Sequence, residues 1–545
     1  MSGFLFLYIR VMKMKNMFRI SFLFLFGNYY AVQAQEYLFP LNHELNWRIA
    51  GALESDSNHF HTSMKPYRVE ELKKIIAVDS LTKADLKESH FYTTWFGRKL
   101  RKEHLLEVNQ DDLHLTLDPI FNFEAGRETG PERNVFVNTR GILIQAKAGE
   151  RFYAYTGFYE NQARYIRYVD RQVVSTGVVP GQGRVKILSD EVFDFNSAFG
   201  GIGYTPGKHF DLQLAQDKNF IGDGYRSLFL SDNSFSYPFF RVTAKFWKLQ
   251  YQVLYALMQD LAEPYNYDAG FQRKYSVIHY LSIHAGKRER FTFGLFESVT
   301  WKNDSTRGFD FTYLNPVIFL RPTENSIGSP DNVMLGGSIK FRISPHHIVY
   351  GQLLIDELVL DEVKAGNGWW GNKQAFQVGY KAFDLFGVRH LNAQTEFNYV
   401  RPFVYAHRSR LQNYAHYNQA LAHPLGANFY ESVTFLNYRW KNILIQLHFN
   451  YAKAGLDSAG TNYGGDIFKD YDTRTSEYGN YMLNGVETKI TNAGVQVQYL
   501  VNPKTNLVVK AGFDERKFSN VFDNEKTQFV YFGISTSLNN FYFDF

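Results

Sequence analysis

Hydrophobic and polar residues alternate one by one over many short stretches of the chain. The pattern is plain in two of them. Ile443, Ile445, Leu447, Phe449 and Tyr451 alternate with Gln446, His448 and Asn450, and Ala393, Thr395, Phe397 and Tyr399 alternate with Asn392, Gln394, Glu396 and Asn398. Successive side chains of a β-strand point to opposite faces of the sheet. The pattern therefore predicts strands with one face suited to lipid and the other to water.

The connections between the predicted strands change length in a regular order. From about residue 113 onward, links of a few residues alternate strictly with links of about 10 to 35 residues, as the short turns and long loops of an outer-membrane barrel do. The runs number roughly eighteen, and an even number places both barrel ends on one side. We therefore predict an all-β transmembrane barrel of antiparallel strands over residues 111–545. A soluble β-sandwich is the alternative.

Both ends of the chain fit export to the outer membrane. Basic residues precede the apolar run 20–26, and compact residues at 32–34 offer a cleavage site, which predicts a signal peptide over residues 1–34. The last alternating run begins at Val530, changes parity at 539–540 and continues to Phe545. A final aromatic residue with aromatics two and four before it resembles the signal that the barrel insertion machinery reads.

Residues 35–110 differ from the rest of the chain in the spacing of their apolar residues. Asp79 and Ser80 offer a helix cap, the apolar residues from Leu81 to Leu100 are spaced for a helix, and a shorter helical stretch runs over 69–76. We predict an N-terminal periplasmic helical region that packs against the barrel floor. No segment after the leader approaches 18 uninterrupted apolar residues, so we expect no membrane-spanning helix.

Composition excludes several classes of function. The 59 Lys and Arg against 54 Asp and Glu give a net charge of +5, and removal of the leader's four basic residues leaves +1, so no nucleic-acid partner is indicated. Cysteine is absent, which excludes disulfides, thiol catalysis and cysteinyl metal sites. Aromatic residues make up 17% of the chain and fit the girdles of a membrane barrel. No metal or cofactor motif is present, and none is expected to bind.

Several ordered motifs resemble those of one family. They are DKNFIGDGYRSL at 217–228, YLNP at 313–316, FLRP at 319–322, WWGNK at 369–373, RPF at 401–403 and HPLGAN at 423–428. Together they resemble the capsule assembly protein Wzi family, and more narrowly its gliding-motility-associated, RemB-like members. The resemblance covers most of the chain after the leader, from about His61 to Phe545.

This resemblance implies both a fold and a role. The fold is an eighteen-stranded barrel in the outer membrane of a Gram-negative bacterium, with a periplasmic helical bundle and a lumen closed by extracellular loops. The role is to hold surface polysaccharide, and the other partners are outer-membrane lipid and the insertion machinery. Members of the family anchor acidic capsules, whereas this chain has no obvious excess of basic charge. The sugar and the oligomeric state stay open.

All of these motifs fall in the long links, where binding chemistry is usually found. Mixed charge, amide and phenol groups favour a loop that folds into the lumen as a plug, with direct ligand contact as the alternative. The residues of the predicted loop plug are Asp217, Lys218, Asn219, Asp223, Tyr225, Arg226, Arg321, Glu324 and Asn332.

A tryptophan pair is the best candidate for polysaccharide contact, because a sugar's C–H face stacks on an indole ring while nearby polar groups bond its hydroxyls. Packing within a loop or at the lipid interface is the alternative. The candidate binding residues are Trp369, Trp370, Asn372, Lys373, Arg401, Tyr405, His407 and His423.

Three functions from different classes are compatible with this sequence. The first is a non-enzymatic barrel that anchors capsular or exopolysaccharide for capsule assembly, surface adhesion or gliding motility. The second is a porin-like channel, because polar residues such as Gln394 and Gln446 would line a lumen wide enough for water. The third is a surface glycan-active enzyme that uses a carboxylate pair from the acids at 356–362. Adjacent residues of a strand point to opposite faces, and no nucleophile elbow is present, so this is the weakest of the three.

Overall fold

The computed structural model describes residues 37–545 apart from 56–59, 86–88, 131, 189–190, 262–269, 306, 320–327, 329–330 and 537–538. The predicted signal peptide lies outside the described residues. Among the described residues, no helix is long and apolar enough to cross a bilayer.

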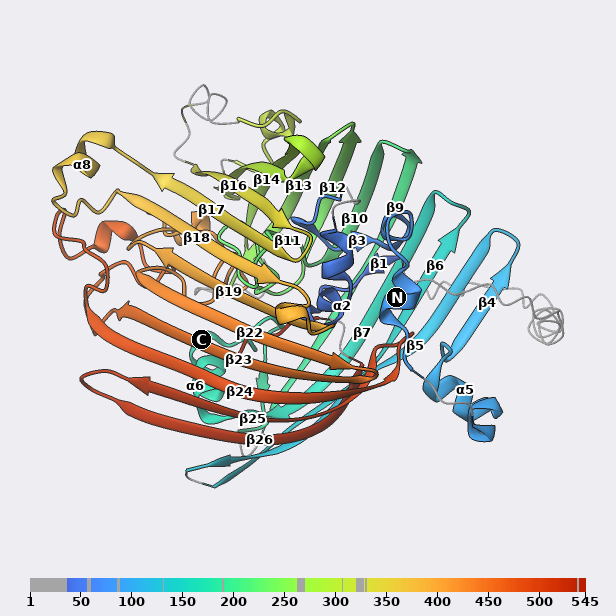
Figure 1. Cartoon of the computed structure of the whole chain (residues 1–545). Coiled ribbons are helices and arrows are strands. Elements are labelled where there is room, and N and C mark those ends of the chain that lie inside the picture. Colours follow the sequence, from blue (N-terminus) through green and yellow to red (C-terminus); the bar gives the residue numbers. More distant parts are fainter. Residues whose placement is uncertain are drawn as a thin grey trace, which may run out of the picture. The chain divides into compact units, whose positions relative to one another are not determined.

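Of the strands in the described residues, eighteen join edge to edge in a closed antiparallel barrel (Figure 1). The sheet closes where β26 pairs with β5, from Gln528 opposite Thr129 to Ser535 opposite Asn122. This confirms the predicted fold class and strand number. The strands are β5 (Leu113–Thr129), β6 (Arg133–Ala148), β7 (Phe152–Arg164), β9 (Phe193–Gly207), β10 (Phe210–Asp217), β12 (Tyr237–Phe246), β13 (Leu249–Asp260), β14 (Gln272–Ala285), β15 (Phe291–Lys302), β16 (Asn332–Ser344), β17 (His347–Glu357), β18 (Lys373–Ala382), β19 (Leu391–Val400), β22 (Phe429–Trp440), β23 (Ile443–Leu456), β24 (Val486–Asn502), β25 (Leu507–Ser519) and β26 (Asn524–Thr536).

The two rims of the barrel differ in the length of their connections. The short-turn rim carries the turns 149–151, 208–209, 247–248, 286–290, 345–346, 383–390, 441–442 and 503–506, and the long-loop rim carries 165–192, 218–236, 261–271, 303–331, 358–372, 401–428 and 457–485. Two further links of the long-loop rim, 130–132 and 520–523, are short, so the prediction of strict alternation is wrong there. The second is a tight turn because the Asn520 side chain accepts bonds from the N–H groups of Phe522 and Asp523, both at 2.8 Å.

Side chains alternate across the wall as the sequence pattern predicts. On β23, Leu447 and Phe449 are exposed on the outer face, whereas Asn450 points inward and is buried. On β19, Phe397 is exposed and its neighbour Asn398 is fully buried. The inward polar residues are buried because parts of the chain fill much of the lumen.

The N-terminal region enters this lumen. Glu54, at the end of α2 (His43–Leu53), forms an ion pair with Lys340 of β16 at 3.0 Å, and Gln498 of β24 donates to Glu44 at 3.2 Å. α2 therefore contacts inward side chains of the wall rather than only the floor. Apolar residues of α2 also pack on α3 (Val69–Lys73) and α4 (Val78–Thr82) in one small core. Two short sheets, β1 (Leu38–Phe39) with β3 (Tyr67–Arg68) and β2 (Met64–Lys65) with β11 (Phe220–Ile221), complete this part.

The helix predicted from Leu81 to Leu100 is wrong as one continuous element. α4 ends at Thr82, and Lys83 has an extended backbone. A separate 3-10 turn, η1 (His90–Thr93), and the helix α5 (Trp95–Arg101) follow, because the Thr94 side chain caps α5 by accepting from the N–H of Gly97 at 3.1 Å. The last residues of the predicted helical region are a strand, β4 (Leu106–Gln110), which pairs with β5.

Smaller elements lie in the loops and turns. They are α6 (Arg167–Thr176), β8 (Lys186–Ile187), η3 (Lys287–Glu289), η4 (Phe311–Leu314), α8 (Leu360–Ala365), η5 (Leu385–Gly387), η6 (Arg410–Gln412), β20 (Ala415–His416), β21 (Gln419–Ala420) and η7 (Tyr471–Thr473).

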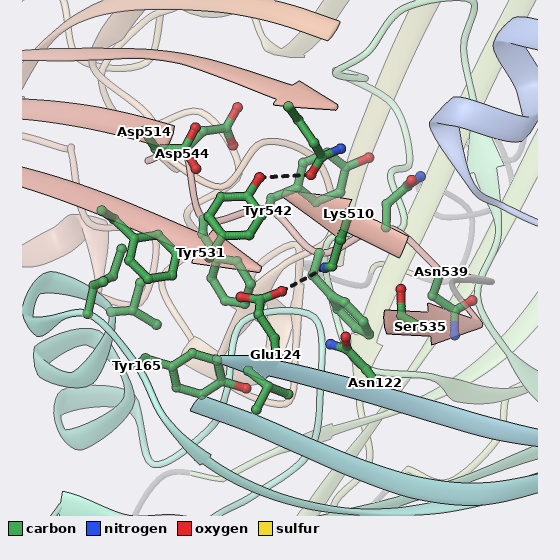
Figure 2. A pocket seen from close by; sticks show the side chains of 18 of the residues that line it. Asn122, Glu124, Tyr165, Lys510, Asp514, Tyr531, Ser535, Asn539, Tyr542 and Asp544 are labelled. Atoms are coloured by element: carbon green, nitrogen blue, oxygen red, sulfur yellow. Dashed lines mark hydrogen bonds and ion pairs between the residues drawn. The ribbon is translucent and has the colours of Figure 1, made fainter. Parts of the chain in front are cut away.

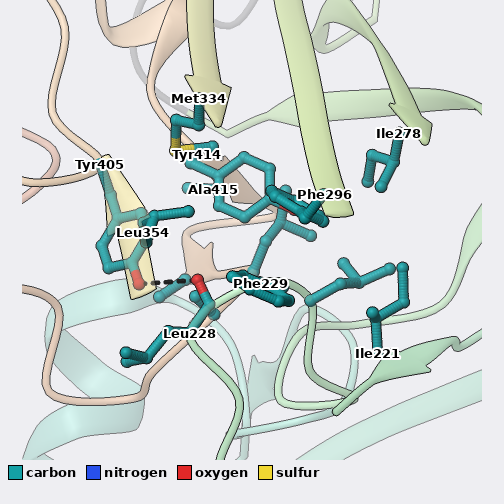
Figure 3. Packing of buried hydrophobic residues seen from close by; sticks show 14 of the residues in the cluster. Ile221, Leu228, Phe229, Ile278, Phe296, Met334, Leu354, Tyr405, Tyr414 and Ala415 are labelled. Carbon is teal, nitrogen blue, oxygen red and sulfur yellow. Dashed lines mark hydrogen bonds between the residues drawn. The ribbon is translucent and has the colours of Figure 1, made fainter. Parts of the chain in front are cut away.

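Two long loops fold inward and form the largest buried apolar cluster (Figure 3). Phe229 of loop 218–236 stacks on Phe296 of β15, with ring centroids 4.6 Å apart. The hydroxyl of Tyr405, from loop 401–428, donates to the carbonyl of Leu228 at 2.9 Å. The two loops are thus joined to each other and to the wall inside the barrel.

The C-terminal residues also lie inside the barrel. β26 ends at Thr536, and the hydroxyl of Tyr542 donates to Asp232 of loop 218–236 at 2.7 Å. The expectation that the last run continues to Phe545 along the wall is therefore wrong. Asn540 donates to the same carboxylate at 2.8 Å, so these bonds direct the tail into the lumen.

Candidate functional site

The first motif of the sequence begins at the end of β10 and continues inside the barrel. Asp217 accepts from the hydroxyl of Tyr155 at 2.7 Å. The Lys218 ammonium donates to the carbonyls of Gly181 and Asp232 at 2.7 and 3.0 Å, and Asn219 accepts from Arg241 at 2.9 Å. Burial lowers the pKa of Lys218 to about 8. Each side chain predicted for the plug here has a partner within the protein.

Asp223 joins the same loop to the N-terminal segment. Its carboxylate accepts from Thr62 at 2.5 Å and from Ser63 at 2.6 Å. Burial alone would raise the pKa of Asp223, but the nearby ammonium groups of Lys340 and Lys65 hold it well below its usual range. Asp223 is therefore held as a buried carboxylate within a cluster of cations.

Arg226 is the centre of a buried ion cluster in the lumen. Its guanidinium contacts Glu431 of β22 at 2.9 Å and Asp544 of the tail at 3.0 Å. The hydroxyl of Tyr225 donates to Asp544 at 3.0 Å. His423 completes the cluster: its Nδ1 accepts from the N–H of Leu425, so Nε2 carries the proton and donates to Glu431 at 2.8 Å. Burial lowers the pKa of His423, which favours this neutral form.

The remaining predicted plug residues divide into two groups. Arg321 and Glu324 lie outside the described residues. Asn332 begins β16, and its side chain donates to the carbonyl of Gln412 in the inward loop 401–428 at 2.8 Å.

The predicted tryptophan pair lies where three loops of the long-loop rim meet. Loop 358–372 supplies Trp369 and Trp370, whose ring centroids are 5.9 Å apart. Trp370 lies 4.7 Å from the ring of Tyr471 in loop 457–485, and the Arg474 guanidinium lies 4.4 Å from its ring centroid. His407 of loop 401–428 contacts the edge of Tyr471 at 5.5 Å. We call these five residues, together with Arg408, Asp472, Tyr478 and Tyr481, the rim cluster.

The rim cluster presents both aromatic and charged groups to solvent. Tyr478 is 49% exposed and Tyr481 52% exposed, and Trp369 and His407 are half-buried. Hydrogen bonds between Asn367 and Gly479 and between Gly368 and Asn480 hold the tyrosine segment against the tryptophan segment. Arg408 and Asp472 form an exposed ion pair at 2.7 Å beside these rings.

Four of the predicted contact residues are buried and have protein partners. Lys373 forms an ion pair with Asp356 at 3.2 Å, and the N–H of Tyr405 donates to the same carboxylate at 2.9 Å. Tyr405 and His423 have no exposed surface, and Asn372 is 5% exposed. These four residues support the loops and do not face solvent, so the structure does not agree with direct contact by them. Asp356, considered as a carboxylate of an enzyme, is likewise buried within this ion pair.

Arg401 supports the rim cluster from below. It is half-buried, and its Nε and Nη2 atoms donate to the carbonyls of Asn372 and Asn480 at 2.7 and 3.3 Å. It therefore joins the tryptophan segment to the tyrosine segment. Sequence reasoning missed the partners of Trp370 in loop 457–485, because no local motif marks Tyr471 or Arg474 and they lie about 100 residues along the chain.

A cavity of about 390 Å³ lies between the C-terminal tail and the wall formed by β5–β7 and β24–β26 (Figure 2). On the lining wall, Lys510 of β25 and Glu124 of β5 form an ion pair at 2.7 Å, on either side of Gly533 of β26. Tyr165, Tyr531 and Tyr542 supply aromatic lining. This cavity lies on the side of the barrel where the two short links of the long-loop rim are found.

Fold and site together define a closed β-barrel with an occupied lumen and a looped rim, as outer-membrane barrels have. The chain is similar in structure to Wzi of Escherichia coli, an outer-membrane protein involved in group 1 capsule assembly and described as a carbohydrate-binding β-barrel. The two are 12% identical, the likeness covers 92% of this chain and 99% of Wzi, and the TM-score is 0.54. At this identity the likeness shows the fold, so a Wzi-like barrel is confirmed, and membership of the family and the RemB relation stay predictions.

Two further solved structures from Pseudomonas aeruginosa are similar at a lower level. OprD is 9% identical over 77% of this chain and 94% of its own, with a TM-score of 0.41, and OccK9 is 10% identical over 78% and 97%, with a TM-score of 0.43. No protein-family model matches the chain, and no curated protein matches it.

Proposed function

We propose that this chain is a non-enzymatic outer-membrane barrel that binds polysaccharide of the cell surface through its rim cluster. The observation that carries the proposal is the arrangement of that cluster, in which three loops bring exposed aromatic rings and an exposed ion pair to one place on the long-loop rim. Wzi, whose barrel this one resembles, is described as carbohydrate-binding, which supports the proposal.

The exposed rings have the chemistry to hold a sugar. Trp370 is already in contact with protein groups, since Tyr471 and Arg474 pack against its ring. Trp369, Tyr478 and Tyr481 therefore supply the surfaces on which the C–H face of a sugar ring stacks. Arg408 and Asp472 donate to and accept from its hydroxyl groups. Lectin-like binding of this kind needs no bond to be made or broken.

The proposal includes an orientation. The long-loop rim faces the surroundings of the cell and the N-terminal helices face the periplasm, since long loops are extracellular in bacterial barrels. The chain reaches this position after removal of its signal peptide and insertion by the barrel insertion machinery, with outer-membrane lipid around its exposed belt. The polysaccharide held there serves capsule assembly, surface adhesion or gliding motility.

A solute channel is the second candidate, and the lumen cavity beside β5 is the observation that favours it. The rest of the described lumen contains the inward loops, the tail and α2. Single-channel recording in planar bilayers separates the two functions. A tether gives a silent membrane, and a porin gives large, stable steps of conductance.

A paired substitution tests the polysaccharide proposal. Trp369→Ala with Tyr478→Ala removes two stacking surfaces, and we expect less polysaccharide to remain on cells that carry this variant. Trp440→Ala is the matched control, because Trp440 is an exposed tryptophan on the opposite rim. Both variants must still shift on heating in gel electrophoresis, which shows that the barrel is folded. Equal retention by the two variants would remove the rim cluster from the proposal.

A further inference from the structure

Three large aromatic side chains are exposed on one short segment outside the barrel wall. Phe91 of η1 is 44% exposed, and Trp95 and Phe96 of α5 are each 60% exposed. Figure 1 shows α5 near the lower end of β4, at the edge of the barrel and away from the elements in the lumen. An exposed apolar group of this kind marks a contact with another molecule or with a membrane.

A single residue shows which side of the wall this segment meets. The guanidinium of Arg101 donates to the hydroxyl of Tyr499 on β24 at 3.0 Å and lies over its ring at 5.5 Å. Gln498, the preceding residue of β24, points into the lumen and contacts Glu44 of α2. Adjacent residues of a strand point to opposite faces, so Tyr499 points to the outer face. The side chain of Asn502, at the end of β24, also donates to the carbonyls of Lys99 and Glu103, both at 2.9 Å, so α5 is held at the short-turn rim with Arg101 on the outer face of the wall.

The strand register places this contact in the aromatic belt of the short-turn rim. Tyr499 is opposite Ile443 of β23, and Ile443 is opposite Trp440 of β22. Trp440 is 56% exposed, and the same rim carries the exposed rings of Trp247 and Phe386. Tryptophan and other aromatic residues gather at the level of the lipid headgroups in membrane proteins. The exposed rings of Phe91, Trp95 and Phe96 therefore extend this aromatic belt outward from the barrel wall.

Basic residues accompany the exposed rings. Residues 95–103 include Arg98, Lys99, Arg101 and Lys102 against the single acid Glu103. Glu103 pairs with Arg98 at 2.9 Å and with Lys99 at 3.1 Å, and Lys102 is exposed. Apolar rings beside an excess of cations are the composition of segments that lie in a membrane interface and contact lipid phosphates.

We propose that η1 and α5 form a lipid-binding element that lies in the leaflet around the short-turn rim. Phe91, Trp95 and Phe96 enter the boundary between headgroups and acyl chains, and Lys102 contacts lipid phosphate. The element has a structural consequence, because α5 leads directly into β4. Ser535, opposite Asn122, is the last residue of β26 that pairs with β5. Beyond it, β4 pairs with the same edge of β5, from Leu106 opposite Leu117 to Gln110 opposite Leu113. Anchoring α5 in lipid holds β4 at this seam.

Fluorescence of Trp95 tests the proposal in the full-length barrel. The barrel is placed in vesicles of phosphatidylethanolamine and phosphatidylglycerol that contain phosphatidylcholine brominated near the start of its acyl chains. The emission of Trp95 is obtained by subtracting the emission spectrum of the conservative variant Trp95→Phe from that of the wild type. Bromine quenches at short range, and an interfacial helix buries its apolar face about 5–10 Å into the boundary between headgroups and acyl chains, which is the level of these atoms, so we expect this difference to fall by at least about twofold.

A second tryptophan supplies the control. Trp369 belongs to the rim cluster, and its difference emission, from Trp369→Phe, should be unchanged by brominated lipid. Iodide in the water phase should quench Trp369 more strongly than Trp95. The proposal is overturned if Trp95 is quenched by iodide and not by brominated lipid. This outcome does not depend on polysaccharide, so it is independent of the proposed function.

Discussion

Removal of the Arg226 guanidinium should cost several kcal/mol of stability, because it breaks a buried ion pair. Arg226 is 2% exposed and Glu431 is 1% exposed, so the substitution Arg226→Met leaves a buried carboxylate without its cation. Glu431 keeps the bonds from His423 at 2.8 Å and from Asn398 at 3.2 Å. Loss of one partner of a buried ion pair costs about 3–5 kcal/mol. The unfolding equilibrium constant should therefore rise by roughly two to four decades, at about 1.4 kcal/mol per decade.

Unfolding of the barrel by guanidinium chloride in detergent, monitored by tryptophan emission, measures this change in the free energy of unfolding. The same measurement on Glu431→Gln and on the double variant completes a double-mutant cycle. Replacement of both partners of a buried ion pair is often nearly neutral. We therefore expect the double variant to recover most of the stability that Arg226→Met loses.

Two results would show that Arg226 and Glu431 do not form a stabilising buried ion pair. One is a loss below about 1 kcal/mol in Arg226→Met, which is the range of an exposed ion pair. The other is a double variant that is no more stable than Arg226→Met alone. Either result would mean that the ion cluster does not fasten the loop and the tail to the wall.

Three further predictions concern the C-terminal tail, Asp223 and the rim cluster. Asp544→Ala releases the tail from Arg226, and planar-bilayer recording should show brief openings that the silent wild type lacks. Nearby cations hold the pKa of Asp223 low, so its contribution to stability is complete above about pH 4 and is lost as pH falls below it. The midpoint of thermal unfolding should therefore depend less on pH below about pH 4 in Asp223→Asn than in the wild type. Burial lowers the pKa of His407 to about 4, so protonation should loosen the rim cluster and weaken glycan binding as pH falls from about 6.5 to 4, and His407→Gln should remove that dependence.

The barrel could be predicted because its signal is local and repeated. Alternation within β19 and β23 gives the outer and inner faces, and the spacing of the turns gives the strand number. The N-terminal helices were harder, because their caps are single side chains such as Thr94 and their apolar spacing continues across the break after Thr82. The inward tail was missed because its partner Asp232 is about 300 residues away.

The site was predictable only in part. The sequence indicates that residues 217–226 carry groups able to form ion pairs, and the structure supplies their partners, Glu431 and Asp544, from distant strands and the tail. The tryptophan pair lies at the rim as expected. Tyr471 and Arg474 contact Trp370 because loops 358–372 and 457–485 meet at the rim. Residue spacing within one loop does not predict a contact with another loop.

In the proposed function, this barrel holds polysaccharide at the cell surface. Its most direct test is to delete the gene in the source bacterium and measure the polysaccharide attached to cells and released to the medium. We expect the attached fraction to fall, the released fraction to rise and the total to stay the same, with recovery on expression of the wild type. An unchanged partition between cells and medium would contradict it.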